Sequence, residues 1–367
     1  MMKKICIVVG ARPNFVKVAP LIRAIQKSGG AEYQLVYAGR EDDPTLEPSL
    51  FDDLQMPHPE VFLGVDSQRL NEITAQVMGA FDRYLDERPA DVVIVVDDLA
   101  STMAAAITAK KRGVKLAHLV AGTRSFDITM PKEVNRLVID ALSDYLFTAG
   151  VKSTGVATRE QADGNNTYMV GNILMDSLRF NLPRFCRPAI EVDEQRYLVL
   201  TLNRRALLND EEHLAKMLRA IAEAAGDVPV IAPLREPALG VVKQLQTSLH
   251  SIPEQSSPTR SLSPITLHPS LPYLEFGWLT AHAKGIITDS GNVAEEATFN
   301  GVPCITLNSY TEHQETVTVG TNVLVGGDTD KLRAALSDVV AGQWKKCALP
   351  DRWDGRTAER IVQILSS

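Results

Sequence analysis

Residues 285–297 combine an expected strand, a tight turn and a helix start, an arrangement that favours anion binding. An apolar pair at 286–287 precedes the Asp-Ser-Gly turn at 289–291, and residues 293–299 have the pattern of a helix. Free N–H groups and the positive dipole end at a helix N-terminus favour a phosphate, and the glycine lets it approach the backbone closely. The acidic or hydroxyl residue of the turn could instead simply cap the helix.

Two glutamates, Glu295 and Glu296, lie about one helical turn beyond this Asp-Ser-Gly turn. A carboxylate accepts hydrogen bonds and so fits the hydroxyl groups of a ribose, while the helix N-terminus holds a diphosphate. Ser290 adds a hydroxyl to the same turn. The stretch is therefore a candidate binding site for a nucleoside diphosphate.

The length and composition limit the class of protein. At 367 residues the chain exceeds one ordinary core, so two domains of roughly 150–200 residues are expected. With 45% hydrophobic and 23% charged residues, the composition is that of a soluble globular protein.

The net charge of −7 argues against a general nucleic-acid binder, which needs a concentrated basic surface. No apolar run approaches the ~20 residues that span a bilayer. The four cysteines have no metal-ligand spacing, so a reducing cytoplasm and no metal site are expected.

Strands and helices alternate along the chain, which is typical of doubly wound α/β lobes with parallel sheets. In the first part, strands are predicted at 4–9, 34–37, 91–96 and 115–120, and helices at 16–27, 49–54, 68–88, 101–112 and 133–142. The pattern restarts after Gly171. There, strands are predicted at 197–202, 228–232, 265–267, 286–287 and 302–307, helices at 211–225, 271–283, 293–299 and 330–341, and a Ser/Pro-rich loop at 251–264.

Polar residues follow several of these strands. Ligands of open parallel sheets bind beyond the carboxyl ends of the strands. The residues expected at these ends are Arg12, Asp97, Asp98, Thr123, Asn203 and Asp289.

Two blocks carry a family signal: Gly10-Ala-Arg-Pro-Asn-Phe-Val-Lys-Val-Ala-Pro20 and Asp289-Ser-Gly-Asn-Val-Ala-Glu-Glu296. Further blocks occur in the matching order, among them Ala121-Gly-Thr-Arg124, Pro131-Lys-Glu-Val-Asn-Arg136, Gly171-Asn-Ile-Leu-Met-Asp176, Thr201-Leu-Asn-Arg-Arg205 and Asp354-Gly-Arg-Thr-Ala-Glu-Arg-Ile361. On these blocks the chain resembles the UDP-N-acetylglucosamine 2-epimerase family over nearly its whole length.

The resemblance implies an α/β fold of two Rossmann-like, doubly wound parallel-sheet lobes of the glycosyltransferase-B type, with an interlobe cleft. The expected domains are an N-terminal lobe at 1–171, a UDP-binding lobe at 172–350, and a C-terminal helix within 351–367 that packs back on the N-terminal lobe. The resemblance also implies a homodimer.

The nucleotide half of the implied site is largely retained. Arg12 and Lys17 match residues that face the diphosphate, and a guanidinium suits a phosphate because its planar fork donates two hydrogen bonds at once. Glu296 matches the carboxylate on the ribose hydroxyls, while Asn292 stands where a second glycine is usual. The implied substrate-binding residues are Arg12, Lys17, Arg204, Ser290, Gly291 and Glu296.

The chemical half of the implied site is altered. In this family UDP is eliminated from the sugar, a proton leaves C2, and the proton and then UDP or water return on the other face, so acid and base groups must flank the sugar. Asp98 matches one such carboxylate. The family's two glutamates and its histidine are replaced by Val120, Lys132 and Asn203. Valine cannot transfer a proton, asparagine is no acid or base near neutral pH, and lysine reverses the charge.

Neighbouring residues allow alternatives. We interpret His118 as a core or supporting group in preference to a proton carrier, and Glu133 as a structural partner of Arg136 at helical spacing. Asp97 and Asp98 are expected to point in opposite directions. Lys132 could pair with the diphosphate or with Asp98, or lie in solvent.

Three functions remain open on the sequence. The first is an isomerase that epimerises or hydrolyses UDP-N-acetylglucosamine, with Asp98 assisted by an unidentified residue and without a cofactor. The second is a nucleotide-sugar-binding or regulatory protein without turnover, and the third is a glycosyltransferase on the same fold. The expected partner in each is a UDP-sugar, with no nucleic acid and no membrane span.

Overall fold

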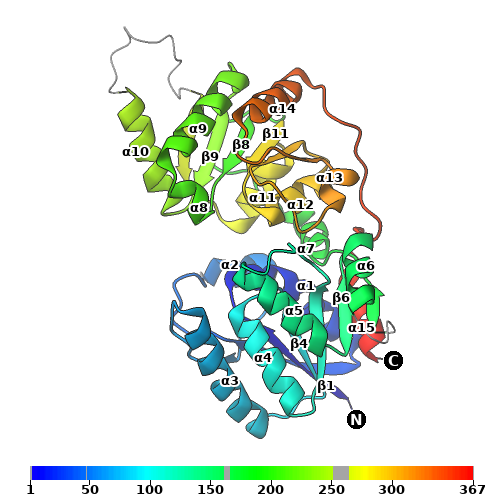
Figure 1. Ribbon diagram of the computed structural model, residues 1–367. Helices are drawn as coiled ribbons and strands as arrows, with labels where there is room; N and C mark the ends of the chain where they lie inside the picture. Colours follow the sequence, from blue (N-terminus) through cyan, green and yellow to red (C-terminus); the bar gives the residue numbers. More distant parts are fainter. Residues whose placement is uncertain (1, 47, 161–165, 251–263, 367) are drawn as a thin grey trace. The chain divides into compact units, whose positions relative to one another are not determined.

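The computed structural model describes residues 2–46, 48–160, 166–250 and 264–366. The chain forms two compact units: unit 1 is Met1–Asn181 with Asp351–Ser367, and unit 2 is Leu182–Pro350. Each unit contains a parallel sheet flanked by helices (Figure 1). The Ser/Pro-rich loop predicted at 251–264 falls almost wholly outside the described residues.

Unit 1 has a seven-stranded parallel sheet in the order β3-β2-β1-β4-β5-β6-β7. Its strands are β1 (Lys3–Val9), β2 (Ala31–Tyr37), β3 (Val61–Phe62), β4 (Val92–Val96), β5 (Lys115–Ala121), β6 (Tyr145–Thr148) and β7 (Thr167–Met169). Its helices are α1 (Arg12–Ser28), α2 (Pro48–Leu54), α3 (Leu70–Glu87), α4 (Ala100–Lys111), α5 (Pro131–Leu142), α6 (Val151–Glu160), α7 (Leu174–Asn181) and α15 (Thr357–Ser366).

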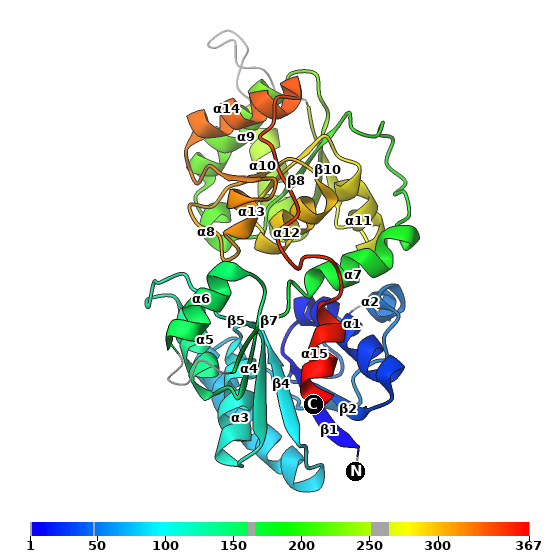
Figure 2. The same ribbon diagram turned by 90° about the vertical axis from the view of Figure 1, so that its right-hand side faces the viewer.

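The core of unit 1 lies on both faces of this sheet. Strand β4 is buried along its whole length, as expected for a parallel strand covered on both faces. Side chains from β1 and β4, including Val8 and Val95, pack against apolar residues of α3 and α4 on one face. Helix α1, with α15 beside it, covers the other face (Figure 2).

Unit 2 has a six-stranded parallel sheet in the order β10-β9-β8-β11-β12-β13. Its strands are β8 (Leu198–Thr201), β9 (Val230–Leu234), β10 (Ile265–Pro269), β11 (Gly285–Thr288), β12 (Cys304–Thr306) and β13 (Asn322–Leu324). Its helices are α8 (Arg205–Leu208), α9 (Glu211–Ala225), α10 (Ala238–His250), α11 (Tyr273–Ala281), α12 (Gly291–Asn300), α13 (Glu315–Thr318) and α14 (Thr329–Ala341), and Leu182–Arg184 forms a 3₁₀ turn. Apolar residues of α9, α10 and α14 pack on one face and those of α11 and α12 on the other.

The boundary between the units lies after Asn181, ten residues beyond the expected Gly171, because α7 belongs with unit 1. Helix α7 packs against α1, and the Ser177 hydroxyl donates to the Val16 carbonyl. The returning segment is fixed by Trp353, whose fully buried indole donates to the Ala149 carbonyl at 3.0 Å. Helix α15 then completes unit 1.

Both sheets have the same central arrangement. In unit 1 the first strand, β1, lies between β2 and β4, and in unit 2 the first strand, β8, lies between β9 and β11. The strand order therefore reverses direction at β1/β4 and at β8/β11. Such switch points form a crevice at the carboxyl ends of parallel strands, where ligands of this architecture bind. No described helix is long and apolar enough to cross a membrane.

Candidate functional site

The switch point of unit 1 brings together the turn after β1 and the turn after β4. Asn14 fixes the first turn, because its side-chain oxygen accepts the N–H groups of Gly10 at 2.9 Å and Ala11 at 3.2 Å. A Cβ on Gly10 would lie 2.0 Å from the Ser101 hydroxyl, so glycine is needed for this close approach to α4. Arg12, the first residue of α1, is partly exposed beside this turn.

Lys17 lies deeper than its expected contact with a diphosphate suggests. Its side chain is buried, and its ammonium lies 2.6 Å from the Asp97 carboxylate. The lysine charge is thus already balanced by an aspartate. In this structure Lys17 supports the switch point, and a direct contact with a ligand stays a prediction.

Asp98 is buried among groups of opposite charge. Arg136 donates from Nε and Nη2 to its Oδ2 at 2.8 and 2.6 Å, and Lys132 Nζ lies 3.3 Å from its Oδ1. Burial alone would raise the pKa of Asp98, but Lys132 and Arg136 outweigh it and hold the pKa below its usual value. Asp98 is therefore a carboxylate at neutral pH. Asp97 bonds to different partners, as expected for adjacent strand-end residues.

The other two expected chemical positions of unit 1 lie on elements next to Asp98. Val120 has a φ of 74°, a left-handed conformation that is unusual for a β-branched residue, at a register shift between β5 and β6. Lys132, in the first turn of α5, is 57% exposed although it pairs with Asp98. Neither the valine nor the lysine side chain can act as a carboxylic acid or carboxylate.

Glu133 has the structural role predicted for it. Its carboxylate lies 3.1 Å from Arg136 Nη1 and also accepts the N–H groups of Ser125 and Phe126 at 2.8 and 3.0 Å. It thereby anchors the loop before α5. Burial would raise the pKa of Glu133, but these hydrogen bonds lower it below the usual value.

His118 is a supporting group, as interpreted from the sequence. It is 1% exposed, with Nδ1 2.5 Å from an Asp140 carboxylate oxygen and Nε2 2.9 Å from the Asp97 carbonyl oxygen. Arg124 Nη2 lies 2.7 Å from the other Asp140 oxygen. Coulombic attraction to these cations outweighs burial and lowers the pKa of Asp140. The ring faces the protein interior.

The switch point of unit 2 is organised by Asp289. Its carboxylate accepts the N–H of Asn203 at 2.8 and 3.0 Å and the N–H of Arg204 at 2.8 Å. Its carbonyl accepts from Arg204 Nε at 3.1 Å and from Asn308 Nδ2 at 3.0 Å. Burial raises the pKa of Asp289 although these N–H groups oppose it. Asp289 therefore ties the β8 turn to the β11 turn.

The start of α12 keeps its N–H groups available. Ser290 occupies the N-cap position, yet its side chain makes no capping hydrogen bond. Asp289 directs its carboxylate toward Asn203 and Arg204. Since the first N–H groups of a helix have no intrahelical partner, the capping alternative considered for this turn is not supported. At Gly291 an added Cβ would meet nothing closer than 4.0 Å, which leaves room above the turn.

Glu296 lies behind this turn, buried within α12. No described residue forms a hydrogen bond or ion pair with its carboxylate. Burial, with a smaller contribution from Glu295, raises the pKa of Glu296 to about 8. Glu295 differs, because His313 Nε2 lies 3.7 Å from its carboxylate. A largely buried carboxylic acid that forms no hydrogen bond with any described side chain or backbone group is a candidate site for a hydrogen-bonding ligand.

Arg204 and Asn203 complete this edge of unit 2. Arg204 places its guanidinium carbon 5.5 Å from the ring centre of Tyr310, within cation–π range. Sequence reasoning did not single out Tyr310 or Asn14, although Asn14 lies within the block that carried the resemblance. Asn203 presents a side chain without acid or base function near neutral pH. No group of metal-ligating side chains occurs among the described residues.

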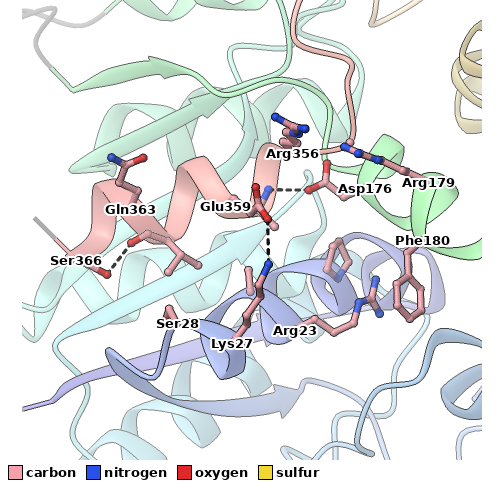
Figure 3. Close-up of a pocket in the computed structure, with 15 residues that line it drawn as sticks. Arg23, Lys27, Ser28, Asp176, Arg179, Phe180, Arg356, Glu359, Gln363 and Ser366 are labelled. Atoms are coloured by element: carbon pink, nitrogen blue, oxygen red, sulfur yellow. Dashed lines mark hydrogen bonds and ion pairs between the residues drawn. The ribbon is translucent and has the colours of Figure 1, made fainter.

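A groove of about 870 Å³ lies elsewhere on unit 1, lined by α1, α7 and α15 (Figure 3). Asp176 lines it and accepts the N–H groups of Thr357 and Ala358, which caps the start of α15. Lys27 and Glu359 pair across it at 3.5 Å. None of the predicted site residues lines this groove. It lies where α15 docks on α1.

The family described as UDP-N-acetylglucosamine 2-epimerase matches residues 23–366. UDP-N-acetylglucosamine 2-epimerase from Methanocaldococcus jannaschii is 31% identical over 99% of both chains. UDP-2,3-diacetamido-2,3-dideoxy-D-glucuronate 2-epimerase from Pseudomonas aeruginosa is 32% identical over 90% of both chains.

The same fold occurs in solved structures. A crystal structure of the M. jannaschii UDP-GlcNAc 2-epimerase in complex with UDP-GlcNAc and UDP has a TM-score of 0.84 and 32% identity, covering 99% of both chains. The chain therefore has two Rossmann-like parallel-sheet units of the glycosyltransferase-B type, as predicted.

Proposed function

The chain belongs to the UDP-N-acetylglucosamine 2-epimerase family, and we propose that it is an isomerase that binds UDP-N-acetylglucosamine and acts at C2 of the sugar. One observation carries the proposal most directly. The uncapped start of α12 lies next to a buried Glu296 carboxyl that has no partner among the described residues. A diphosphate and a ribose would satisfy both groups at once.

The nucleotide half of the proposed site is argued from the switch point of unit 2. The first N–H groups of α12, the Ser290 hydroxyl and the space above Gly291 suit the diphosphate, and Glu296 accepts from the ribose hydroxyls. Arg204 contributes from the β8 turn. In unit 1, Arg12 at the start of α1 is the residue that the resemblance assigns to the diphosphate. Lys17 acts indirectly in this scheme, through Asp97. The relative from M. jannaschii, whose structure contains UDP-GlcNAc and UDP, supports this ligand class.

The chemical half of the proposed site rests on Asp98. Its lowered pKa makes it a carboxylate that can accept a proton or stabilise positive charge near the sugar. Lys132, paired with it and more than half exposed, is the adjacent group able to donate a proton. Removal of the C2 proton and departure of UDP would then precede return of the proton on the other face, followed by return of UDP to give the epimer or addition of water to give the free sugar.

A second candidate function is nucleotide-sugar binding without turnover. Val120, Lys132 and Asn203 support it, because none of them supplies a carboxylic acid or an imidazole. The retained nucleotide-binding residues would then serve only to bind the UDP-sugar.

Deuterium exchange separates these functions. The protein is incubated with UDP-N-acetylglucosamine in heavy water, while deuterium at C2 and release of UDP are followed by NMR. We expect incorporation at C2, together with the manno epimer or with UDP and free N-acetylmannosamine. Binding of UDP without deuterium exchange or UDP release would exclude the isomerase function and favour the function of a nucleotide-sugar-binding protein. A parallel incubation with the diacetamido glucuronate analogue tests the substrate named for the Pseudomonas relative.

We also propose a homodimer that uses the exposed face of α5. Val134 and Leu137, one turn apart, are 41% and 36% exposed, and Leu70 at the start of α3 is 48% exposed. Apolar side chains in such a row favour an interface. Light scattering should give twice the 40.1 kDa chain mass, and Leu137→Glu should halve it. Val151→Glu, at an apolar residue of α6 that is 66% exposed, is the control.

The proposed location is the cytoplasm. All four cysteines are free, and two of them, Cys186 and Cys347, are exposed. Exposed free thiols suit a reducing compartment.

A further inference from the structure

Asp97 bonds to two other elements of unit 1, α1 and β5. Its carboxylate accepts from Lys17 Nζ at 2.6 Å and from Asn14 Nδ2 at 2.8 Å, both on α1. Its carbonyl oxygen lies 2.9 Å from His118 Nε2 on β5. Asp97 directly follows β4, so one residue links the carboxyl end of β4 to α1 and to β5.

The contacts on α1 lead directly to the Arg12 turn. Asn14 donates to Asp97 with its amide nitrogen and accepts from Gly10 and Ala11 with its oxygen. This assigns the orientation of the Asn14 amide, since a carboxylate can only accept and an N–H can only donate. Asp97 therefore fixes the side chain that holds the backbone beside Arg12.

The contact on β5 restrains the Asp97 backbone. Asp97 has a φ of 58°, a left-handed conformation that is uncommon for a residue with a Cβ, although aspartate adopts it more readily than most. His118 donates to the carbonyl of this residue, whose peptide bond continues into Asp98. The direction of Asp98 therefore depends on the conformation of Asp97.

His118 contacts two oxygen atoms. Its Nε2 lies 2.9 Å from the Asp97 carbonyl oxygen and its Nδ1 lies 2.5 Å from an Asp140 carboxylate oxygen. Asp140 is fixed in turn by Arg124 Nη2 at 2.7 Å and by the Gly122 N–H at 3.0 Å. The ring is thus clamped between β4 and α5.

We propose that Asp97 is a positioning residue that couples the Arg12 turn to the Asp98 carboxylate, with His118 as its support. This rests on the proposed function, in which Arg12 holds the diphosphate and Asp98 faces the sugar. In this proposal Asp97 contacts neither the diphosphate nor the sugar. Its carboxylate acts on nucleotide binding through Asn14, and its backbone acts on the chemistry through Asp98.

A double-mutant cycle tests the first arm. Asp97→Asn, Arg12→Ala and the double variant are compared with the wild type by calorimetric titration with UDP. We expect Asp97→Asn to weaken UDP binding roughly tenfold in the wild-type background and by less than twofold in the Arg12→Ala background, because both act through one contact. Equal weakening in both backgrounds would overturn the proposal. Asp144→Asn is the matched control. Asp144 also pairs with lysines, Lys110 of α4 and Lys115 of β5, but it lies beside the N-terminal end of β5, away from Arg12 and Asp98.

His118 variants test the second arm. His118→Ala should lower the rate of C2 deuterium exchange at saturating UDP-sugar at least tenfold, while the KM changes by less than threefold. His118→Gln, whose amide can still donate to the Asp97 carbonyl, should recover most of the rate. Equal rates in the Ala and Gln variants would overturn this arm. If the wild type shows no exchange, the proposed isomerase fails, and the UDP cycle still decides the role of Asp97.

Discussion

The Asp289 carboxylate accepts the backbone N–H of Asn203 on both of its oxygens, at 3.0 and 2.8 Å, although the two residues lie 86 positions apart. The side chain belongs to the turn that starts α12, yet it bonds to the turn that starts α8. The acidic residue of the Asp-Ser-Gly turn is therefore a brace between two turns, which leaves the helix start open for a ligand.

Removal of this brace should destabilise unit 2. Asp289→Ala deletes a buried acceptor of backbone N–H groups, and we expect the free energy of unfolding to fall by about 2 kcal/mol in urea titrations. The affinity for UDP should fall as well, since the turn before α8 and the turn before α12 are no longer held together. Asp338→Ala, at an exposed aspartate of α14, should leave both quantities unchanged. Equal stability of the two variants would contradict the bracing role.

Binding of UDP should release a proton from Glu296. Because burial raises its pKa to about 8, the free protein holds this group mostly protonated at pH 7, while ribose hydroxyls favour the carboxylate. UDP affinity should therefore rise between about pH 6 and 8 and level off above that. Calorimetry in buffers of different ionisation enthalpy counts the released protons.

The Glu296→Gln variant isolates this effect from the titration of UDP itself. It should bind UDP more weakly and lack the Glu296 contribution to proton release. Glu295→Gln should move the pH midpoint downward, because Glu295 contributes to the raised pKa of its neighbour. Identical proton counts for the wild type and Glu296→Gln would contradict the assignment.

Glycine should be better tolerated than alanine at position 120. In an ordinary strand glycine is less stable than alanine by about 0.5–1 kcal/mol. Val120 has a φ of 74°, where a Cβ costs roughly 1–2 kcal/mol, so the order should reverse. Thermal or urea unfolding of Val120→Gly and Val120→Ala measures the difference. A less stable glycine variant would show that the left-handed conformation is not strained.

Lys132→Gln should raise the pKa of Asp98. The lysine is the largest of the groups that lower this pKa, and glutamine removes its charge while keeping a similar length. Because Lys132 is also the proposed proton donor, the rate of C2 exchange should fall at every pH, and the acidic limb of its pH profile should move to higher pH. Lys111→Gln, at an exposed lysine of α4, is the charge-matched control and should leave the limb in place.

The main elements could be predicted because their patterns are long. The apolar run at 91–96 and the periodic helix at 211–225 agree with β4 and α9 to within a residue. The short strands β6, β7 and β13, with three or four residues each, give too few positions for a period. Helices α6 and α10 contain internal glycines, which weaken the helical signal.

The residue types of the site could be predicted from the sequence better than the contacts that these residues make with one another. The turn at Ser290 and the buried Glu296 are local features of one helix start. The pairing of Lys17 with Asp97, across 80 positions, depends on how β1 and β4 come together and has no local signal. Lys17 was for that reason expected at the ligand, whereas the structure pairs it with an aspartate.

The discontinuity of unit 1 has a consequence for synthesis on the ribosome. Its sheet is encoded before residue 181, but Trp353 and α15, which pack onto that sheet and onto α1, follow the whole of unit 2. In a nascent chain unit 2 is therefore complete while unit 1 still exposes the apolar surface that α15 covers. Chaperones that bind exposed apolar surface should meet unit 1 during that interval.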